Sequence, residues 1–169
     1  MNTKIHRRRW LLDQARVGLG VAAAGSLVGL FGGSRNLLQG AESVRQRWQP
    51  AIDKGLNWLA KTQSSRGQWN TQHYPTAMAA LAGTAMIASG STTTQGPYAK
   101  EIALAADYLI GKSRSNGLIG DPQTDSRYTY GHGFSMLFLS QVLGEEGLLD
   151  RREELVEVLT KAVQFSGYA

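Results

Sequence analysis

The chain has 169 residues, a formal net charge of +5 and no cysteine. Its length suffices for one domain of ordinary size, and the lack of cysteine excludes disulfides, thiolate metal ligands and a cysteine nucleophile. The surplus positive charge lies in residues 1–40, because basic and acidic side chains are equal in number in residues 41–169. The body therefore has no basic surplus to attract a phosphate backbone, and we do not expect a nucleic acid partner.

Residues 1–40 have the layout of an export signal: a basic start, an apolar run from Val17 to Phe31 and a polar exit. The basic start resembles the twin-arginine signal through Arg7, Arg8, Arg9, Trp10 and Leu11. This resemblance implies that the protein folds first and is then exported by the twin-arginine translocase, to the periplasm or beyond. An uncleaved leader that anchors the chain is the alternative, although a run of about 15 apolar residues is short for a bilayer span of about 20.

The sequence of residues 41–169 predicts five helices. Apolar periodicity indicates three amphipathic ones, and two runs of uncharged residues indicate the others. The amphipathic segments are 44–63, 98–112 and 150–166, and Pro50 is expected to mark the start of the first, since proline is tolerated in a first turn. The uncharged segments are 76–89 and 128–144. A helix without a polar face must be covered on several sides, so we expect the uncharged helices to form an inner layer beneath the amphipathic ones.

The amphipathic segments also align with one another. At an offset of 50, Gly55, Leu56, Trp58 and Leu59 fall on Ala105, Ala106, Tyr108 and Leu109. At an offset of 107, Gly55, Leu56 and Trp58 fall on Ala162, Val163 and Phe165. Repeats of this length, each a helix pair, predict a solenoid or a closed ring.

One stretch has a specific spacing, formed by Lys54, Gly55, Trp58, Leu59, Gln63, Gly67 and Trp69. It resembles the QW motif of the squalene and terpenoid cyclases, and residues 51–169 are similar to the prenyltransferase and squalene oxidase repeat. The resemblance implies an all-α fold in which helix pairs close into an α/α toroid around a cavity, with this chain supplying about five helices of an incomplete ring. It further implies that the Gln63 side chain forms hydrogen bonds with backbone groups at a helix end and that the Trp69 indole stacks on Gln63. Both roles are structural.

The resemblance implies an apolar cavity for an isoprenoid-like or other hydrophobic ligand, but it leaves enzyme activity open. The Asp-x-Asp-Asp motif of the cyclases is absent, because three residues separate Asp121 from Asp125, and both are expected in a solvated loop. The zinc set of the protein prenyltransferases includes a cysteine, which this chain lacks. We therefore expect no metal and no cofactor.

His132 is the strongest of four weak catalytic candidates. It resembles the zinc-binding histidine at the cavity mouth of the prenyltransferases, where it could act as a ligand, an acid or base, or a polar contact. The alternative is a partly buried histidine that caps the start of its helix. Tyr128 and Tyr130 flank it as packing or rim residues, and His73 occupies a comparable position before the first uncharged helix.

Two other classes of function remain open. A non-catalytic binding or assembly module would self-associate through the open end of the incomplete ring. A carbohydrate-active α/α toroid would need paired carboxylates that face the cavity, which the uncharged helices do not provide. At the offset of 107, Gln63 maps to position 170, so we expect the sequence to be the N-terminal part of a longer protein.

Overall fold

The computed structural model describes residues 34–168, with side chains from residue 46 onwards. The chain divides between Pro50 and Ala51 into two compact units, and the second unit contains the helix pairs. The division falls at residue 51, ten residues after the start of the predicted body at 41. The predicted export signal, including Arg7, Arg8, Arg9, Trp10 and Leu11, lies outside the described residues.

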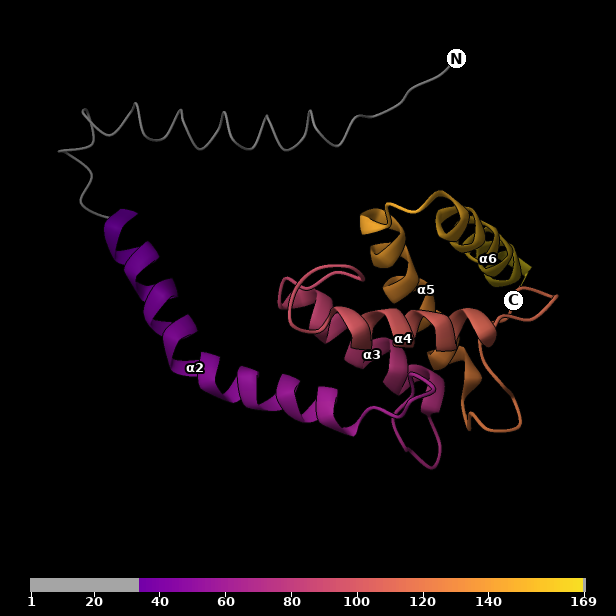
Figure 1. Cartoon of the computed structure of the whole chain (residues 1–169), viewed down its shortest axis with the longest axis horizontal. Helices are drawn as coiled ribbons and strands as arrows, with labels where there is room; N and C mark the ends of the chain where they lie inside the picture. Colours follow the sequence, from indigo (N-terminus) through magenta and orange to yellow (C-terminus); the bar gives the residue numbers. More distant parts are fainter. Residues whose placement is uncertain (1–33, 169) are drawn as a thin grey trace, which may run out of the picture. The chain divides into compact units, whose positions relative to one another are not determined.

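The described part is all-α, with five helices in the order α2 (Ser34–Thr62), α3 (Pro75–Ala88), α4 (Ala99–Gly111), α5 (Tyr128–Glu145) and α6 (Leu149–Tyr168) (Figure 1). No β-strand occurs among these residues, where one isolated bridge joins Ser113 to Ile119. Four of the five helices begin and end within a few residues of the predicted bounds. The apolar periodicity placed α4 and α6, and the runs of uncharged residues placed α3 and α5.

The start of α2 differs from the prediction, because Pro50 lies inside this helix instead of beginning it. A proline inside a helix removes one backbone hydrogen bond and costs about 3 kcal/mol. The helical residues before it include several Gln, Arg and Leu, which are good helix formers. The helical segment therefore extends to both sides of Pro50, although the division between the two units falls directly after it.

The uncharged helices α3 and α5 lie side by side and run parallel. The first turn of α3 contacts the first turn of α5, and the middle of α3 contacts the middle of α5. A Cβ atom added to Gly131 would lie 3.0 Å from Thr76 Cβ, and one added to Gly83 would lie 2.4 Å from Phe138 Cε2. Glycine at position 131 allows α5 to approach Thr76 closely, and glycine at position 83 leaves room for the Phe138 ring. The small residues that the sequence places in the uncharged segments thus form the contact between them.

The amphipathic helices α4 and α6 pack on this pair. α3 packs on α4 as well as on α5, and α5 packs on α6. Polar contacts also join successive amphipathic helices: Tyr98 donates to Asn57 Oδ1 at 3.3 Å, and Arg151 pairs with Asp107 at 2.7 Å. The first contact connects α4 to the end of α2, and the second connects α6 to α4.

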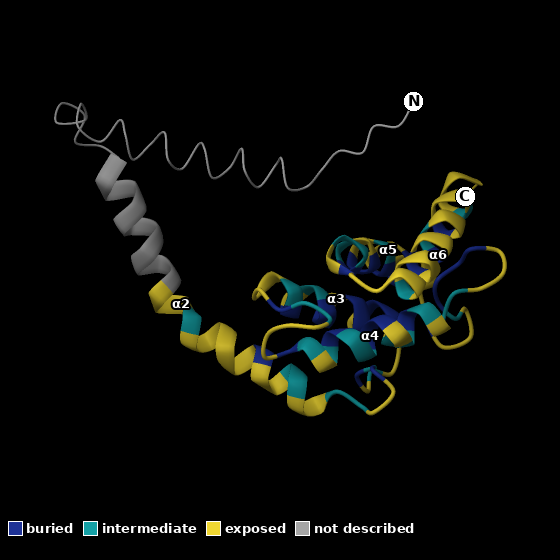
Figure 2. Cartoon of the chain, turned by 45° about the horizontal axis from the view of Figure 1, so that its top comes forward, coloured by how far each residue is buried: buried dark blue, intermediate teal, exposed yellow. Residues whose placement is uncertain are grey.

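The core lies between the two layers. Its largest fully buried side chains are Met86 in α3, Ile102 and Leu109 in α4, Ile119 in the loop after α4, Phe138 and Leu139 in α5, and Leu155 in α6. Figure 2 shows the buried residues concentrated on α3, α4 and α5, whereas much of α6 is exposed. Burying an apolar side chain of this size contributes about 1.5 to 3 kcal/mol, so this cluster is the main source of stability.

Candidate functional site

The turn after α2 contains the second half of the motif that resembles QW. The Gln63 amide donates to the carbonyls of Gly67 at 3.1 Å and Glu101 at 2.9 Å. Glu101 lies in the first turn of α4, so one side chain connects two successive helix pairs. The buried Trp69 indole donates to the Leu59 carbonyl at 2.9 Å, near the end of α2. Both side chains thus donate to backbone carbonyls of the turn and of the two helices beside it, which is a structural role.

Gly67 sits at the centre of this turn with a φ of 83°, a conformation that favours glycine. A Cβ atom here would lie 2.0 Å from the Leu104 carbonyl oxygen. The turn therefore packs directly on the backbone of α4, and a larger residue would force the two apart.

Three residues in the first half of the motif lie on the surface, whereas Leu59 packs against the core. Trp58 is 62% exposed, and Lys54 and Gly55 are also exposed. No neighbouring atom would lie within 4 Å of a Cβ atom at Gly55. These three residues make no contact that accounts for their place in the motif.

The turn after α4 repeats the geometry of the turn after α2. Gly117 has a φ of 91°, and a Cβ atom on it would lie 2.2 Å from the Lys161 carbonyl oxygen of α6. Two backbone hydrogen bonds of the first turn recur in the second turn at an offset of 50 residues. In the first turn, Ser64 N donates to Gln68 O and Gly67 N donates to Ser64 O. In the second turn, Arg114 N donates to Leu118 O and Gly117 N donates to Arg114 O. Each turn thus packs on the next amphipathic helix.

His132 is buried between α5 and α6. Its Nδ1 accepts a hydrogen bond from the Ile119 backbone N–H at 3.1 Å, and its Nε2 lies 3.0 Å from Ser166 Oγ. The ring also meets the edge of Phe165, with centroids 5.1 Å apart. Burial lowers the pKa of this imidazole below its ordinary value, so it is neutral at pH 7. Both ring nitrogens are engaged within the chain.

The other three catalytic candidates lie on the surface. Tyr128 is 38% exposed and Tyr130 is 54% exposed. The His73 side chain is also exposed, and its backbone carbonyl accepts a bond from Ser126 N at 2.9 Å. This bond joins the approach to α3 with the approach to α5, but no side-chain hydrogen bond links these three residues to His132.

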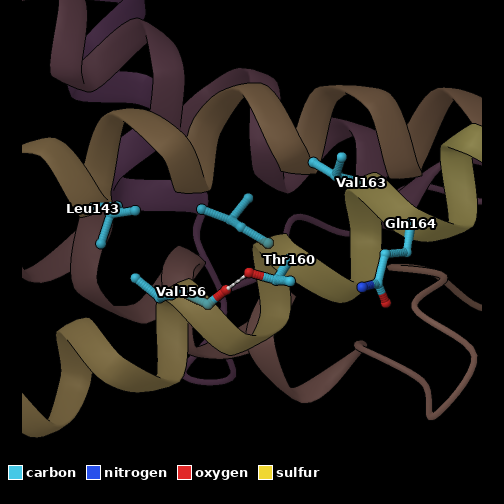
Figure 3. A pocket seen from close by; sticks show the side chains of 6 residues that line it. Leu143, Val156, Thr160, Val163 and Gln164 are labelled. Carbon is cyan, nitrogen blue, oxygen red and sulfur yellow. Dashed lines mark hydrogen bonds between the residues drawn. The ribbon is translucent and has the colours of Figure 1, made fainter. Parts of the chain in front are cut away.

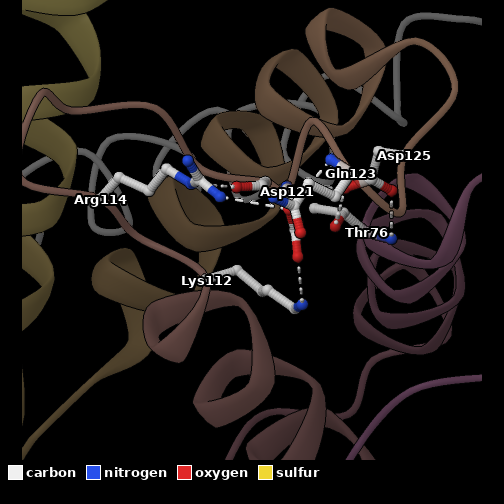
Figure 4. Close-up of polar contacts among 7 residues, drawn as sticks. Thr76, Lys112, Arg114, Asp121, Gln123 and Asp125 are labelled. Carbon is white, nitrogen blue, oxygen red and sulfur yellow. Dashed lines mark hydrogen bonds and ion pairs between the residues drawn. The ribbon is translucent and has the colours of Figure 1, made fainter.

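The expectation of a solvated loop for the two aspartates was wrong for Asp125. This carboxylate is 3% exposed and accepts bonds from Thr76 Oγ1 at 2.6 Å, Thr76 N at 3.2 Å and Asp121 N at 3.0 Å (Figure 4). It therefore caps the start of α3, a role that the sequence could not reveal because Thr76 is 49 residues away.

Asp121 is only partly exposed and belongs to the same cluster. It pairs with Arg114 at 3.1 Å and lies 3.7 Å from Lys112 Nζ (Figure 4). The Gln123 backbone N–H, together with these two cations, holds the pKa of Asp121 below its usual range. The loop between α4 and α5 is therefore an ordered network of charges.

A set of exposed apolar side chains follows α3 and α5, and no pattern in the sequence singled it out. We call it the apolar stripe; its members are Tyr74, Met78, Leu81, Tyr130, Phe134 and Leu137, which are 36% to 54% exposed. On each helix they recur at i, i+4 and i+7, so they form one face. Because α3 and α5 are parallel neighbours, the two faces run along adjacent helices, and both remain exposed. The uncharged segments were expected to be covered on several sides, and the structure leaves these two faces open.

A second apolar surface lies between α5 and α6. It is a pocket of about 460 Å³ lined by Leu143, Val156, Leu159, Thr160, Val163 and Gln164 (Figure 3). Val163 is 59% exposed, whereas Ala106, at the equivalent position in α4, is fully buried. The same position is covered in one repeat and open in the next.

Among the side chains described, those of residues 46–168, no cluster of three His, Asp or Glu is arranged to hold a metal ion. None of the helices in residues 34–168 combines the length and the apolar character that a membrane span requires.

The chain was also compared with known proteins. No protein-family model, curated protein or solved structure matches it.

Proposed function

We propose that this chain is a repeat protein of the prenyltransferase and squalene cyclase type, and that its apolar stripe binds an elongated, uncharged, isoprenoid-like molecule. The observation that carries the proposal is the stripe itself, six exposed apolar side chains along two parallel helices and the residue before the first of them. Exposed apolar surfaces of this extent are typical of binding sites.

The chemistry of the stripe favours a hydrocarbon ligand over a polar one. Residues 75–99 contain no charged side chain, and neither do residues 128–144. A sugar, nucleotide or peptide would lose hydrogen bonds to water here without gaining partners. A branched hydrocarbon chain would instead bury apolar area, which contributes about 25 cal/mol per Å². Tyr130 and Phe134 add flat aromatic faces, against which such a chain packs well.

The proposal assigns binding and no reaction to these residues. His132, the strongest catalytic candidate, has both nitrogens engaged within the chain. Using it as an acid or a ligand would require at least one of those bonds to break.

A titration of the full chain with a fluorescent farnesol analogue tests the proposal. We expect saturable binding that weakens at least tenfold in a Phe134→Ser, Leu137→Gln double variant, because two of the six stripe side chains lose their apolar surface. Leu149→Gln is the matched control, since Leu149 is 75% exposed but lies on α6. Equal binding by the double variant and the parent would refute the stripe as the site.

Export by the twin-arginine route is part of the proposal. It rests on Arg7, Arg8 and Arg9 with the aromatic and leucine that follow. Residues 1–40 fused to a reporter that crosses only when folded should deliver it outside the cytoplasm. Replacing the three arginines by lysine should abolish delivery, and unchanged delivery would exclude this route.

Assembly is a second candidate function, favoured by the open pocket between α5 and α6. Leu159 and Val163 are at positions equivalent to Ile102 and Ala106, which are fully buried. We propose that a second copy of the chain covers this surface. Sedimentation of the full chain should then give a dimer mass that Val163→Lys reduces to the monomer. A monomer mass for the parent at high concentration would exclude this candidate.

A further inference from the structure

The amphipathic helices contact one another along two edges, and each kind of contact occurs twice within the chain. On one edge, which we call the leading edge, a helix receives the turn that follows the preceding amphipathic helix. The turn at Gly67 packs on the Leu104 carbonyl of α4. The turn at Gly117 packs in the same way on the Lys161 carbonyl of α6. Both carbonyls correspond to that of Lys54 in α2, at the offsets of 50 and 107.

The leading edge of α2 is open. A Cβ atom on Gly55, the residue after Lys54, would meet no atom of the described residues within 4 Å. Its equivalents, Ala105 in α4 and Ala162 in α6, are both fully buried. Trp58, one turn further along α2, is 62% exposed. Among the described residues, the leading edge of α2 therefore holds no turn, unlike those of α4 and α6.

The other edge, which we call the trailing edge, contacts the next amphipathic helix through a polar side chain. In α2 this side chain is Asn57, which accepts a hydrogen bond from Tyr98 at the start of α4. In α4 it is Asp107, which pairs with Arg151 of α6. The equivalent residue of α6 is Gln164, which is exposed and lines the pocket between α5 and α6 (Figure 3). The trailing edge of α6 is therefore open as well.

We infer that these two open edges bind each other between copies of the chain, so that the trailing edge of α6 in one copy packs against the leading edge of α2 in the next. The inference rests on the assembly proposed above, and it identifies the surface of the second copy that covers the pocket at Val163. The occupant is a second copy because the chain carries both halves of a contact that it already forms between α2 and α4 and between α4 and α6. Such a contact joins two different surfaces, and two copies form a closed pair when each gives one edge to the other.

Two variants, one on each edge, test this contact by sedimentation of the full chain. Gly55→Lys adds a long charged side chain to the leading edge of α2, and Val163→Lys does the same in the pocket at the trailing edge of α6. Each variant alone should sediment as a monomer. An equimolar mixture of the two should recover a dimer, because each copy retains the edge that the other lacks. Its dissociation constant should exceed that of the parent at least tenfold, since the mixed dimer holds one contact instead of two.

Gly55→Ala is the matched control. Alanine occupies the equivalent buried positions in α4 and α6, so this variant should remain a dimer. Because the space around Gly55 is open, Gly55→Lys should unfold cooperatively with a thermal midpoint no lower than that of monomeric Val163→Lys.

The outcomes separate this inference from the assembly proposal on which it rests. A monomer mass for the parent would refute both. A dimer mass for the parent together with a dimer mass for Gly55→Lys would keep the assembly but overturn the contact between unlike edges. A mixture of the two lysine variants that stays monomeric would also overturn it.

Discussion

Thr76 donates its hydroxyl to Asp125 at 2.6 Å and thereby joins the first turn of α3 to the loop before α5. The same carboxylate accepts the Thr76 backbone N–H, one of the N–H groups that a helix start leaves without a partner within the helix. Both groups are buried. This pair therefore fixes where the two parallel helices begin relative to each other.

Replacing Asp125 by asparagine should destabilise the fold. One carboxylate oxygen becomes an NH₂ group that faces an N–H or O–H donor, and leaving such a donor buried and unpaired costs about 1 to 3 kcal/mol. Urea unfolding followed by circular dichroism measures the loss. Asp107→Asn is the control, because Asp107 is 56% exposed and its ion pair with Arg151 is worth about 1 kcal/mol at most. Equal losses in the two variants would contradict the role assigned to Asp125.

Two glycines of the motif should respond in opposite directions to alanine. Gly67→Ala places a Cβ atom 2.0 Å from the Leu104 carbonyl oxygen at a φ of 83°, and the conformation alone costs about 1 to 2 kcal/mol. Gly55 lies inside α2 with open space around it, so Gly55→Ala should stabilise by about 0.5 to 1 kcal/mol. Chemical denaturation of the two variants measures both changes. A Gly67→Ala protein as stable as the parent would refute the close packing of the turn on α4.

The stability of the fold should fall as the pH drops below 6.5. Burial lowers the pKa of His132 in the folded state relative to its ordinary value of 6.5, so the unfolded chain binds the proton more tightly. The contribution of neutral His132 to the free energy of unfolding is then complete above pH 6.5, and it is lost as the pH falls through the folded-state pKa. The loss is about 1.4 kcal/mol for each unit by which folding lowers this pKa.

Thermal midpoints measured from pH 8 to pH 5 check this dependence. In the His132→Gln variant the thermal midpoint should decrease less between pH 8 and pH 5, because glutamine does not titrate. His73→Gln should retain it, since His73 is exposed. The pKa of Asp121 and that of Glu157 are both lowered, so their contributions are lost at a more acidic pH. A midpoint of the parent that stays constant over this range would contradict the buried, neutral state of His132.

Gln63 should be sensitive to a change of charge at its amide. Its Nε2 donates to two backbone carbonyls, those of Gly67 and Glu101. Gln63→Glu replaces this donor with an anionic acceptor that faces both oxygens, so we expect urea unfolding to show a loss of about 2 kcal/mol, within the cost of an unsatisfied buried polar group. Gln95→Glu, in an exposed loop, is the control. A neutral effect at Gln63 would show that the bridge contributes nothing to the contact between repeats.

The helices could be predicted from the sequence because their signals are local. Apolar spacing, the proline at the start of α3 and the glycines after α2 and α4 each act over a few residues. Pro50 shows the limit of such signals, since proline is a reliable start signal only where the residues before it are not helical. The alignment of Gly67 with Gly117 is also visible in the sequence, and in the structure both glycines make equivalent contacts.

The candidate site was less predictable because it depends on contacts between distant residues. The burial of Asp125 requires Thr76, and the engagement of His132 requires Ile119 and Ser166, which come from another turn and another helix. The apolar stripe was hidden for a related reason. An uncharged helix shows no periodicity that distinguishes its covered sides from its open one, so only the packing of α3 and α5 reveals the stripe.

The assignment of the apolar stripe as a binding surface can be tested by photo-cross-linking of the full chain with a benzophenone-bearing farnesol analogue, followed by mass spectrometry of the peptides. We predict that the label is found on peptides containing the segments 74–81 and 130–137, and that excess unlabelled farnesol removes it. Label confined to α6, or label that unlabelled farnesol does not displace, would contradict the assignment.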